Sequence, residues 1–324
     1  MPITVGTTDV TAISRAAIMP DFADAIYKSN VLFYRTNQAN KVIIDGGYQI
    51  EKPVLYQRPG VGGAYSGYDV YNVSPFESFQ NAAWDWKQYV MPVSVDGLTM
   101  IRTDSPEAIA NYVKEKFNIA NMELAMILGT DLYASTGAGA DIKKLDGLAS
   151  AVASTGTYGT IPHTNSYWQS PMDTGSPVLT LALMQSLWGK LTVGREHPTI
   201  ILGRQGAYNI YWGLLVNKQN YQLQPAGTDE LLGQAGFTNL LFNNAPFVVD
   251  SQVDIGTNVG GKVYMLNENT GSLKVSKRAN FAMEDFQKPT NQDVMVAAIL
   301  FAGNYILDNP RLSGVFTGLD TTHQ

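Results

Sequence analysis

Cysteine is absent from this chain of 324 residues, and histidine occurs only three times. Without cysteine the chain forms no disulfide and no thiolate metal site, and it has no cysteine nucleophile. The histidines, His163, His197 and His323, lack the spacing that places two metal ligands on one helix. Any covalent link between subunits would need other chemistry.

Charge and long apolar runs are also scarce. Charged residues make up 15% of the chain and the net charge is -6, whereas proteins that bind nucleic acid without regard to sequence carry a basic surplus. The longest apolar runs, such as residues 294–301, are much shorter than a membrane span. The N-terminus shows no basic segment followed by an apolar one. We expect a soluble protein that is made and used in the cytoplasm.

Catalytic motifs are missing as well. Residues 256–262 match the first seven positions of a phosphate-binding loop, but Val263 replaces the required hydroxyl and a strand pattern follows. The sequence contains no Gly-x-Ser-x-Gly elbow and no calcium loop. The adjacent carboxylates Glu284 and Asp285 are typical of a solvated patch. We therefore predict no catalytic, cofactor or metal site, and no enzyme.

One long helix is the clearest local signal that is present. Ser105 and Pro106 can begin it as N-cap and first helical residue, and Gly129 is its expected end. Apolar side chains recur every three or four residues, while Lys114 and Lys116 face away. The apolar positions are Ile109, Val113, Phe117, Ala120, Leu124 and Leu128. Such a helix spans about 36 Å, which suits an elongated subunit.

The segments before this helix predict an arm and a long hairpin. Residues 1–40 are expected to form an arm with one helix, in which Ile18, Phe22 and Ile26 recur at helical spacing with Phe33 near the same spacing, and extended chain elsewhere. From residue 41 to 96 the period becomes strand-like, with a Gly/Pro-rich tip at 58–63. Strands are expected at 42–44, 48–56, 68–73 and 84–95.

This hairpin is rich in aromatic residues. Ten of the 42 residues from Tyr48 to Tyr89 are aromatic, against 10% of the whole chain. The rings either lie under a sheet of the same chain or contact another subunit, where aromatic residues are enriched. We favour the second interpretation and place the main inter-subunit contact here. The expected interface residues are Arg58 at the tip, Glu51, Lys52, Asp69 and Glu77 along the edges, and Trp84 and Trp86.

After the long helix comes a segment rich in small residues. Residues 134–177 contain 18 Gly, Ser and Thr residues. A connection of this length is usually functional, disordered or docked on a partner. We expect it to be anchored near residues 145–148, 157–161 and 167–169.

The second half of the chain predicts an α/β unit followed by strands. Helices are expected at 179–191 and 204–216, with a buried strand at 199–202 between them. The inner face of the second helix is expected to carry Tyr208, Tyr211, Trp212 and Leu215. Two hairpins are expected next, 237–242 with 247–250 and 263–267 with 273–277. A long apolar strand at 294–305 completes the pattern.

The order of these segments resembles the major capsid proteins of tailed bacteriophages, the Hong Kong 97 fold. The most similar stretch is residues 240–250, LLFNNAPFVVD, which resembles the family's strand, turn and strand ending in a Pro and an Asp. Residues 263–267 look like the strand that follows it. Residues 157–159 and 167–168 also resemble capsid relatives, although Thr160 and Pro162 depart from the pattern.

The resemblance implies an α+β fold with four parts. These are an N-terminal arm (1–40), an extended β-hairpin loop (41–100), a peripheral domain with the long spine helix (101–178 and 251–324) and an α/β axial domain (179–250). It implies a structural subunit that assembles with itself, as hexamers and pentamers, into an icosahedral shell around phage double-stranded DNA. An encapsulin-like cellular compartment, and a soluble α/β enzyme with an unrecognised site, remain alternatives.

The implied partners follow from this role. We expect a portal, a separate scaffolding protein or a removed N-terminal segment, and leave a decoration protein open; no cofactor and no membrane are expected. Contact with packaged DNA should be weak and without sequence preference, through residues such as Lys114 and Lys116. The protein would be found in the virion after assembly in the host cytoplasm.

Overall fold

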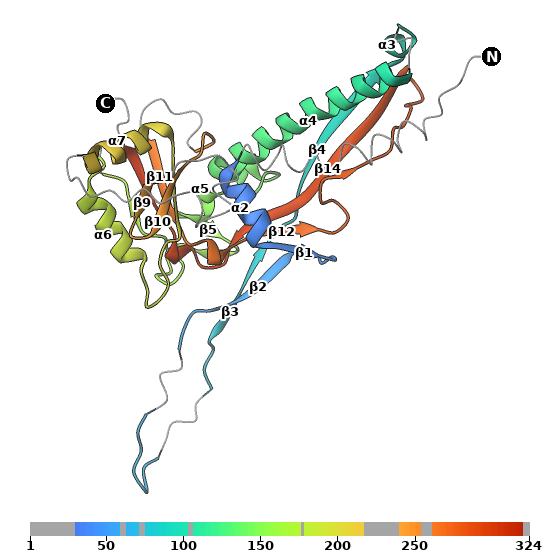
Figure 1. Ribbon diagram of the computed structural model, residues 1–324. Helices are drawn as coiled ribbons and strands as arrows, with labels where there is room; N and C mark the ends of the chain where they lie inside the picture. Colours follow the sequence, from blue (N-terminus) through green and yellow to red (C-terminus); the bar gives the residue numbers. More distant parts are fainter. Residues whose placement is uncertain are drawn as a thin grey trace.

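The computed structural model describes residues 30–58, 63–70, 75–102, 106–175, 178–216, 240–253 and 261–319. Two bodies make up most of it, and a thin hairpin projects away from both (Figure 1). One body is a long sheet with a long helix lying along it. The other is a compact α/β lobe. The predicted helix near 18–26, His323 and the phosphate-loop-like turn before residue 261 lie outside the described residues.

The long helix is α4, Pro106–Ala134, 29 residues or about 44 Å. The predicted apolar stripe is confirmed, since Val113, Phe117, Leu124 and Leu128 are all buried. The predicted end at Gly129 is wrong, because the helix continues to Ala134. A side chain at Gly129 would place its Cβ 2.7 Å from the Asn30 Nδ2 atom. This glycine therefore permits close packing and does not end the helix.

The sheet beneath α4 is built on one long strand. Strand β14, Val294–Leu307, pairs antiparallel with β4, Lys87–Asp96, over ten residue pairs. On its other side β14 pairs with β12 and β13, and β12 pairs with β1. The bounds are Lys41–Ile44 for β1, Gly271–Ser276 for β12 and Ala282–Met283 for β13. Helix α4 packs on β4, so helix and strands share one elongated core (Figure 1).

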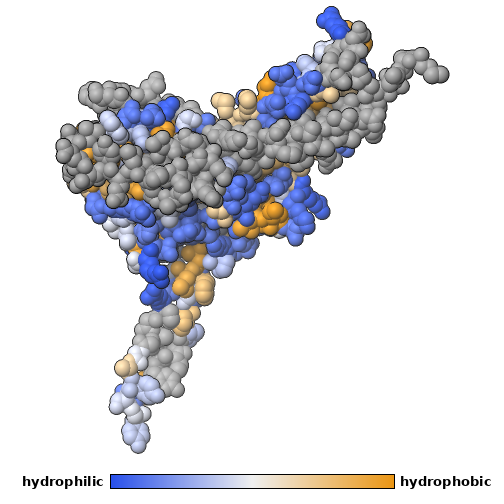
Figure 2. All heavy atoms as spheres, viewed as in Figure 1, coloured by the Kyte–Doolittle hydropathy of each residue, from blue (hydrophilic) through white to orange (hydrophobic). Residues whose placement is uncertain are grey.

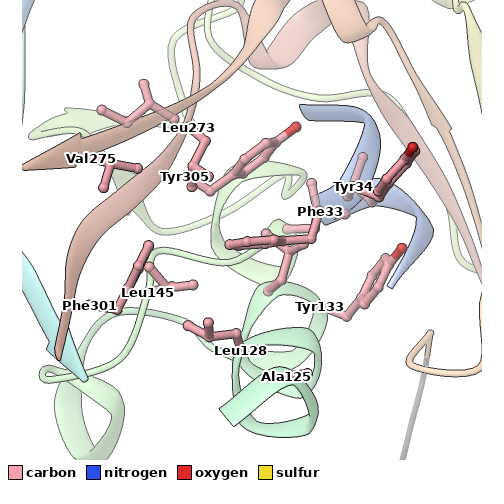
Figure 3. Close-up of a cluster of buried hydrophobic side chains, with 14 of the residues drawn as sticks. Phe33, Tyr34, Ala125, Leu128, Tyr133, Leu145, Leu273, Val275, Phe301 and Tyr305 are labelled. Carbon is pink, nitrogen blue, oxygen red and sulfur yellow. The ribbon is translucent and has the colours of Figure 1, made fainter. Parts of the chain in front are cut away.

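A short helix, α2, Val31–Ala39, closes the end of this core. From the sequence, Phe33 was placed near the helical spacing of Ile18, Phe22 and Ile26, and the extended chain predicted for the rest of this segment is wrong. The Asn30 side chain caps the helix by accepting a hydrogen bond from Phe33 N at 3.1 Å. The ring of Phe33 packs against Phe281 and Phe301. Figure 3 shows Phe33 directed into a cluster that joins α2, α4, β12 and β14. Long-range packing therefore stabilises this helix.

The α/β lobe holds a second sheet of six strands in the order β7-β15-β11-β8-β10-β9. Their bounds are Met172–Asp173, Gly314–Leu319, Gly261–Leu266, Ile200–Gly203, Ala245–Val249 and Leu240–Phe242. Helices α6, Leu181–Leu191, and α7, Gln205–Val216, flank this sheet. The predicted helix–strand–helix unit is confirmed, and so is the turn at Asn243 and Asn244, where φ is 47° and 69°.

Two predictions in this lobe are wrong. Strands β11 and β12 form no hairpin: β11 lies in the six-stranded sheet and β12 in the five-stranded one. The short helix η2, Glu268–Thr270, turns the chain from one sheet to the other. Trp212 is 52% exposed, whereas Tyr211 is buried. Trp212 was predicted on the same inner face as Tyr211, but consecutive helical residues lie about 100° apart around the helix. Tyr211 faces the sheet and Trp212 points away from it.

Polar contacts fasten α2 to this connection between the sheets. Arg35 donates to both carboxylate oxygens of Glu268, at 2.6 and 2.9 Å. Thr199, just before β8, donates its hydroxyl to Glu268 Oε2 at 3.1 Å. Asn40 Nδ2 donates to the Glu268 carbonyl at 2.6 Å. Glu268 thus links α2 to both sheets.

The loop between α4 and α6 is docked on its own subunit. Its short elements are η1 Gly139–Asp141, α5 Leu148–Ala151, β5 Thr157–Tyr158 and β6 Ile161–Pro162. Leu145, Leu148, Tyr158 and Trp168 are buried, which confirms the expected anchor points. Among the described residues no helix is both long and apolar enough to cross a membrane.

The projecting hairpin consists of β2, Ile50–Leu55, paired antiparallel with β3, Phe79–Trp84. The single strand predicted for 84–95 is wrong. Strand β3 ends at Trp84, and β4 begins at Lys87 in the other sheet. A strand was predicted at 68–73. Residues 68–70 form no strand, and residues 71–73 lie outside the described residues. The short helix α3, Gly97–Arg102, follows β4.

Candidate assembly interface

The outer part of the hairpin carries large apolar side chains that the chain itself leaves uncovered. Tyr68 is fully exposed and Tyr65 is 72% exposed, while Phe76 and Phe79 are more than half exposed. Hydrophobic residues also show at the foot of the hairpin, where it leaves the body (Figure 2). Apolar surface gathered in this way marks an interaction site. The segment that is rich in aromatic residues therefore carries an exposed apolar surface.

The predicted charged residues lie along this hairpin, but several have partners close by. Glu51 accepts a hydrogen bond from Asn81 Nδ2 across the two strands, at 2.8 Å. Asp69 accepts from the backbone N–H of Ser66 at 2.8 Å. Arg58 and Glu77 are exposed. Their pairing with a second subunit stays a prediction.

The predicted tip at 58–63 is wrong: Leu55 pairs with Phe79, and the chain turns between Ser66 and Asp69, whose N–H donates to the Ser66 carbonyl at 3.0 Å. Arg58 therefore lies near the foot of the hairpin and not at its tip.

Lys52 was expected to pair across a subunit junction, and here the structure differs. Its ammonium forms an ion pair with Asp308, at the end of β14 in the same chain. Lys52 therefore fixes β2 to the body of its own subunit. Sequence spacing could not reveal this, because the partners are far apart along the chain.

The two tryptophans also differ from the expectation. Trp84 is 3% exposed, and its ring lies 5.5 Å from that of Tyr158 in the same chain. Trp86 is half-buried and donates its indole N–H to the Gly47 carbonyl at 3.0 Å. Trp84 is therefore a core residue and not an interface residue. Its substitution should act on the fold, contrary to the expectation from the sequence.

We expect Trp84→Ala to lower the free energy of unfolding by about 3–5 kcal/mol, the usual cost of truncating a buried aromatic side chain. Trp84→Phe should cost much less, since the buried indole N–H finds no acceptor among the described residues. Urea denaturation followed by circular dichroism measures both. An equal loss for the two variants would contradict this placement of the ring.

A groove lies at the foot of the hairpin, with a volume of about 380 Å³. One wall is the hairpin end from Leu55 to Arg58. The other is formed by the loop residue Tyr167 and by Glu196 and Arg311 of the body. Its lining is mixed: the rings of Tyr56 and Tyr167 lie beside the charged residues Arg58, Glu196 and Arg311.

A second uncovered apolar row lies on α4. It consists of Ile119, Met122 and Met126, which are each more than half exposed and lie along one helical face. Only the buried stripe of this helix was predicted from the sequence. The signal for the outer row was present, because apolar residues recur at steps of three and four on that face too.

The remaining candidates for chemistry have structural roles. The ring of His163 is buried, with Nδ1 3.0 Å from the Trp168 carbonyl oxygen and Nε2 2.9 Å from that of Ser150. His197 stacks on Trp188. Across the described ranges, no group of three or more His, Asp or Glu residues could hold a metal ion. Asp250, whose pKa is raised by burial, accepts a hydrogen bond from the Tyr133 hydroxyl at 2.8 Å and joins α4 to the α/β lobe.

Comparison with known proteins decides the fold. No protein-family model and no curated protein sequence matches the chain. Among solved structures, the capsid of cyanophage A-1(L) matches with a TM-score of 0.64 and 16% identity, over 90% of this chain and 93% of that one. The chain has the capsid fold of tailed bacteriophages. The Hong Kong 97-type fold predicted from the sequence is confirmed.

Other structures share this capsid fold. The capsid of Myoviridae phage XM1 matches with a TM-score of 0.55 and 12% identity, over 87% of this chain and 91% of that one. The SrpI encapsulin of Synechococcus elongatus matches with a TM-score of 0.59 and 9% identity, over 91% and 90%. These neighbours are capsid and shell proteins, which are structural and not enzymes.

Proposed function

We propose that this protein is the major capsid subunit of a tailed bacteriophage and that it assembles with itself into an icosahedral shell around double-stranded DNA. The observation that carries the proposal is the capsid fold together with a projecting hairpin whose large rings are uncovered. Uncovered rings on a two-stranded arm gain stability only when another surface covers them. A second copy of the chain is the surface that the fold suggests.

The geometry of the hairpin favours rings of subunits. An arm that leaves one side of a subunit and docks on a different surface of the next copy makes a head-to-tail contact, and such contacts form rings where the rotation between copies closes. Hexamers and pentamers are the rings that an icosahedral shell needs. The uncovered row on α4 offers a second surface for contact with neighbours.

The domain assignment belongs to this proposal. The sequence predicts an N-terminal arm at 1–40, an extended loop at 41–100, an axial domain at 179–250 and a peripheral domain formed by 101–178 and 251–324. We propose these four parts with changes in which strands belong to each. Because β7, β11 and β15 pair in the sheet of the α/β lobe, we count these strands with the axial domain. Strand β4 pairs with β14, so we count it with the peripheral domain and not with the extended loop. The peripheral domain then centres on α4, β4 and β14.

Contact with the enclosed DNA should be weak. The net charge is -6, and the outer side of α4 offers Lys114 and Lys116, of which Lys116 lies over the Tyr112 ring at 5.5 Å. We expect a gel shift of duplex DNA by the free subunit to vanish at moderate salt, because only a few phosphates are neutralised. A salt-resistant, sequence-selective shift would contradict this.

The partners and the location are part of the same proposal. A portal and a separate scaffolding protein would guide assembly in the host cytoplasm, and the finished shell would be the virion head. Among the matched structures is the procapsid of satellite phage P4, which includes a size-determination protein. That precedent supports an assembly partner of this kind.

Electron microscopy of the purified protein tests the proposal. Closed shells or hexameric rings of uniform size are expected, and a monodisperse small oligomer would contradict a shell subunit and favour the enzyme alternative. An encapsulin-like compartment is the second candidate, supported by the match to the SrpI encapsulin. Nuclease-protected DNA in shells purified from infected cells is expected for a phage capsid. Shells that enclose protein cargo instead would identify a compartment.

A further inference from the structure

The foot of the hairpin is held by the loop that connects α4 and α6. The backbone N–H of Ala83 donates to the Gly159 carbonyl at 3.1 Å. The neighbouring ring of Trp84 lies against Tyr158 and Gly159. The last residues of β3 are therefore bonded to the turn between β5 and β6.

This turn has an unusual backbone. Gly159 and Thr160 have φ angles of 57° and 67°, so both central residues lie in the left-handed region. Glycine adopts that region freely, but a β-branched threonine does so only at a cost, and such strain persists where the surroundings hold it. A Cβ at Gly159 would lie 2.6 Å from the Trp84 ring. Both the short distance to the Trp84 ring and the left-handed backbone therefore favour glycine at position 159.

A second contact lies slightly farther out along the hairpin. The Tyr167 hydroxyl donates to Gln80 Oε1 at 2.8 Å and accepts from Asn165 Nδ2 at 3.2 Å. The Tyr167 ring lies 5.7 Å from that of Tyr56, which follows β2. Tyr167 therefore touches both strands of the hairpin from one side. The Lys52–Asp308 ion pair gives a third point, on β2.

The loop itself is fixed to the core. The Tyr158 hydroxyl accepts the N–H of Leu307 at 2.8 Å, and Trp168 Nε1 donates to the Tyr158 carbonyl at 3.0 Å. Tyr158 and Trp168 are both buried. Because these two residues fix the loop to the core, the contacts of the loop with the hairpin fix the direction of the hairpin relative to the core.

Small rotations at the foot have large effects at the tip. The chain from Gln80 to Gly67 can reach roughly 40 Å when extended, so a rotation of about 10° would move the tip by about 7 Å. A two-stranded hairpin has little stability of its own to resist such a rotation. The contacts at the foot therefore decide where the exposed rings of the tip arrive.

We propose that Tyr158, Gly159, Thr160 and Tyr167 form a clamp that sets the direction of the hairpin, and so determines where on a neighbouring copy it docks. Its role in assembly rests on the proposed function. Tyr158, Gly159 and Tyr167 contact the hairpin and not the neighbour, and Thr160 completes the turn that holds Gly159. All four are therefore positioning residues. Their loss should leave the tip free to reach several places, and shells should then vary in size or remain open.

The clamp can be tested by distance measurement, because the chain has no cysteine to interfere with labelling. Spin labels on Glu77→Cys in the hairpin and Glu115→Cys on α4 report the angle, since both residues are exposed. Labelled subunits are diluted with unlabelled protein so that distances within one subunit dominate. We expect one narrow distribution for the parent, a broad one for Tyr167→Ala and a displaced one for Gly159→Ala.

A matched control removes a hydroxyl elsewhere. Tyr211→Phe loses a hydrogen bond to the Leu241 carbonyl in the α/β lobe, and the distances should not change. Should Tyr167→Ala fail to fold, Tyr167→Phe removes only the hydroxyl bonded to Gln80 and should still broaden the distribution. Parent-like distances in Gly159→Ala and in the Tyr167 variant that folds would overturn the clamp. A parent protein that forms no shells would instead contradict the proposed function, because the distance readout needs no assembly.

Discussion

Replacing Tyr65, Tyr68 and Phe76 together with serine is expected to leave the subunit folded and to prevent closed shells. These side chains are largely exposed within the subunit, so the free energy of unfolding should hardly change. Buried aromatic residues at the centre of an interface cost about 2 kcal/mol or more each when truncated. The loss recurs at every junction of a shell. Electron microscopy and sedimentation measure closure, and circular dichroism checks the fold.

The control for this variant exchanges exposed rings elsewhere on the subunit. Tyr48, before β2, and Trp212, on α7, are both exposed and lie away from the tip. Serine at these two positions should leave shell yield and size near those of the parent. If the tip variant assembled as well as this control, the hairpin would not be the main contact between subunits.

The second large effect is expected at the ion pair between Arg35 and Glu268. Both side chains are mostly buried, with 11% and 18% exposed. Glu268→Leu leaves the Arg35 charge without its carboxylate and removes the acceptor for Thr199. We expect a loss of roughly 2–4 kcal/mol in the free energy of unfolding, below the range for a fully buried pair because some water reaches both groups. Urea denaturation measures this loss.

Two further variants test whether the loss of stability comes from this ion pair or from any change of charge. The double variant Arg35→Leu with Glu268→Leu should recover part of the loss, since no unpaired charge remains. Lys277→Leu breaks the exposed pair with Asp45 and should change stability little. Equal losses for Lys277→Leu and Glu268→Leu would show that Glu268 does not link the two sheets as described.

Much of the fold was predictable where the signal is local. Four elements were predicted from residues that are close together in the sequence. They are helix α4, with its apolar period, the buried strand β8, the Asn243–Asn244 turn and the long strand β14. The bounds of helix α2 were not predicted beyond the spacing of Phe33, because packing of this ring against Phe301 of β14 stabilises the helix. Gly129 was misread as a helix end because its real constraint is the approach of Asn30. Contacts between distant segments leave no local pattern.

The candidate interface was predictable in outline but not residue by residue. Aromatic enrichment located the hairpin, and the exposed rings of Tyr65 and Tyr68 agree with that location. Trp84 has the same composition signal, yet it packs on Tyr158 within the subunit. Lys52 has a partner, Asp308, that only the fold brings near. Composition detects that rings are in excess, and only the three-dimensional structure tells which are covered.

A cryo-electron microscopy reconstruction of the assembled protein tests the central claim most directly. We predict a closed icosahedral shell in which the hairpin of each subunit lies over an adjacent copy, with Tyr65, Tyr68 and Phe76 buried at that contact. Particles without a closed shell, or a shell in which each hairpin folds back on its own subunit, would contradict the account.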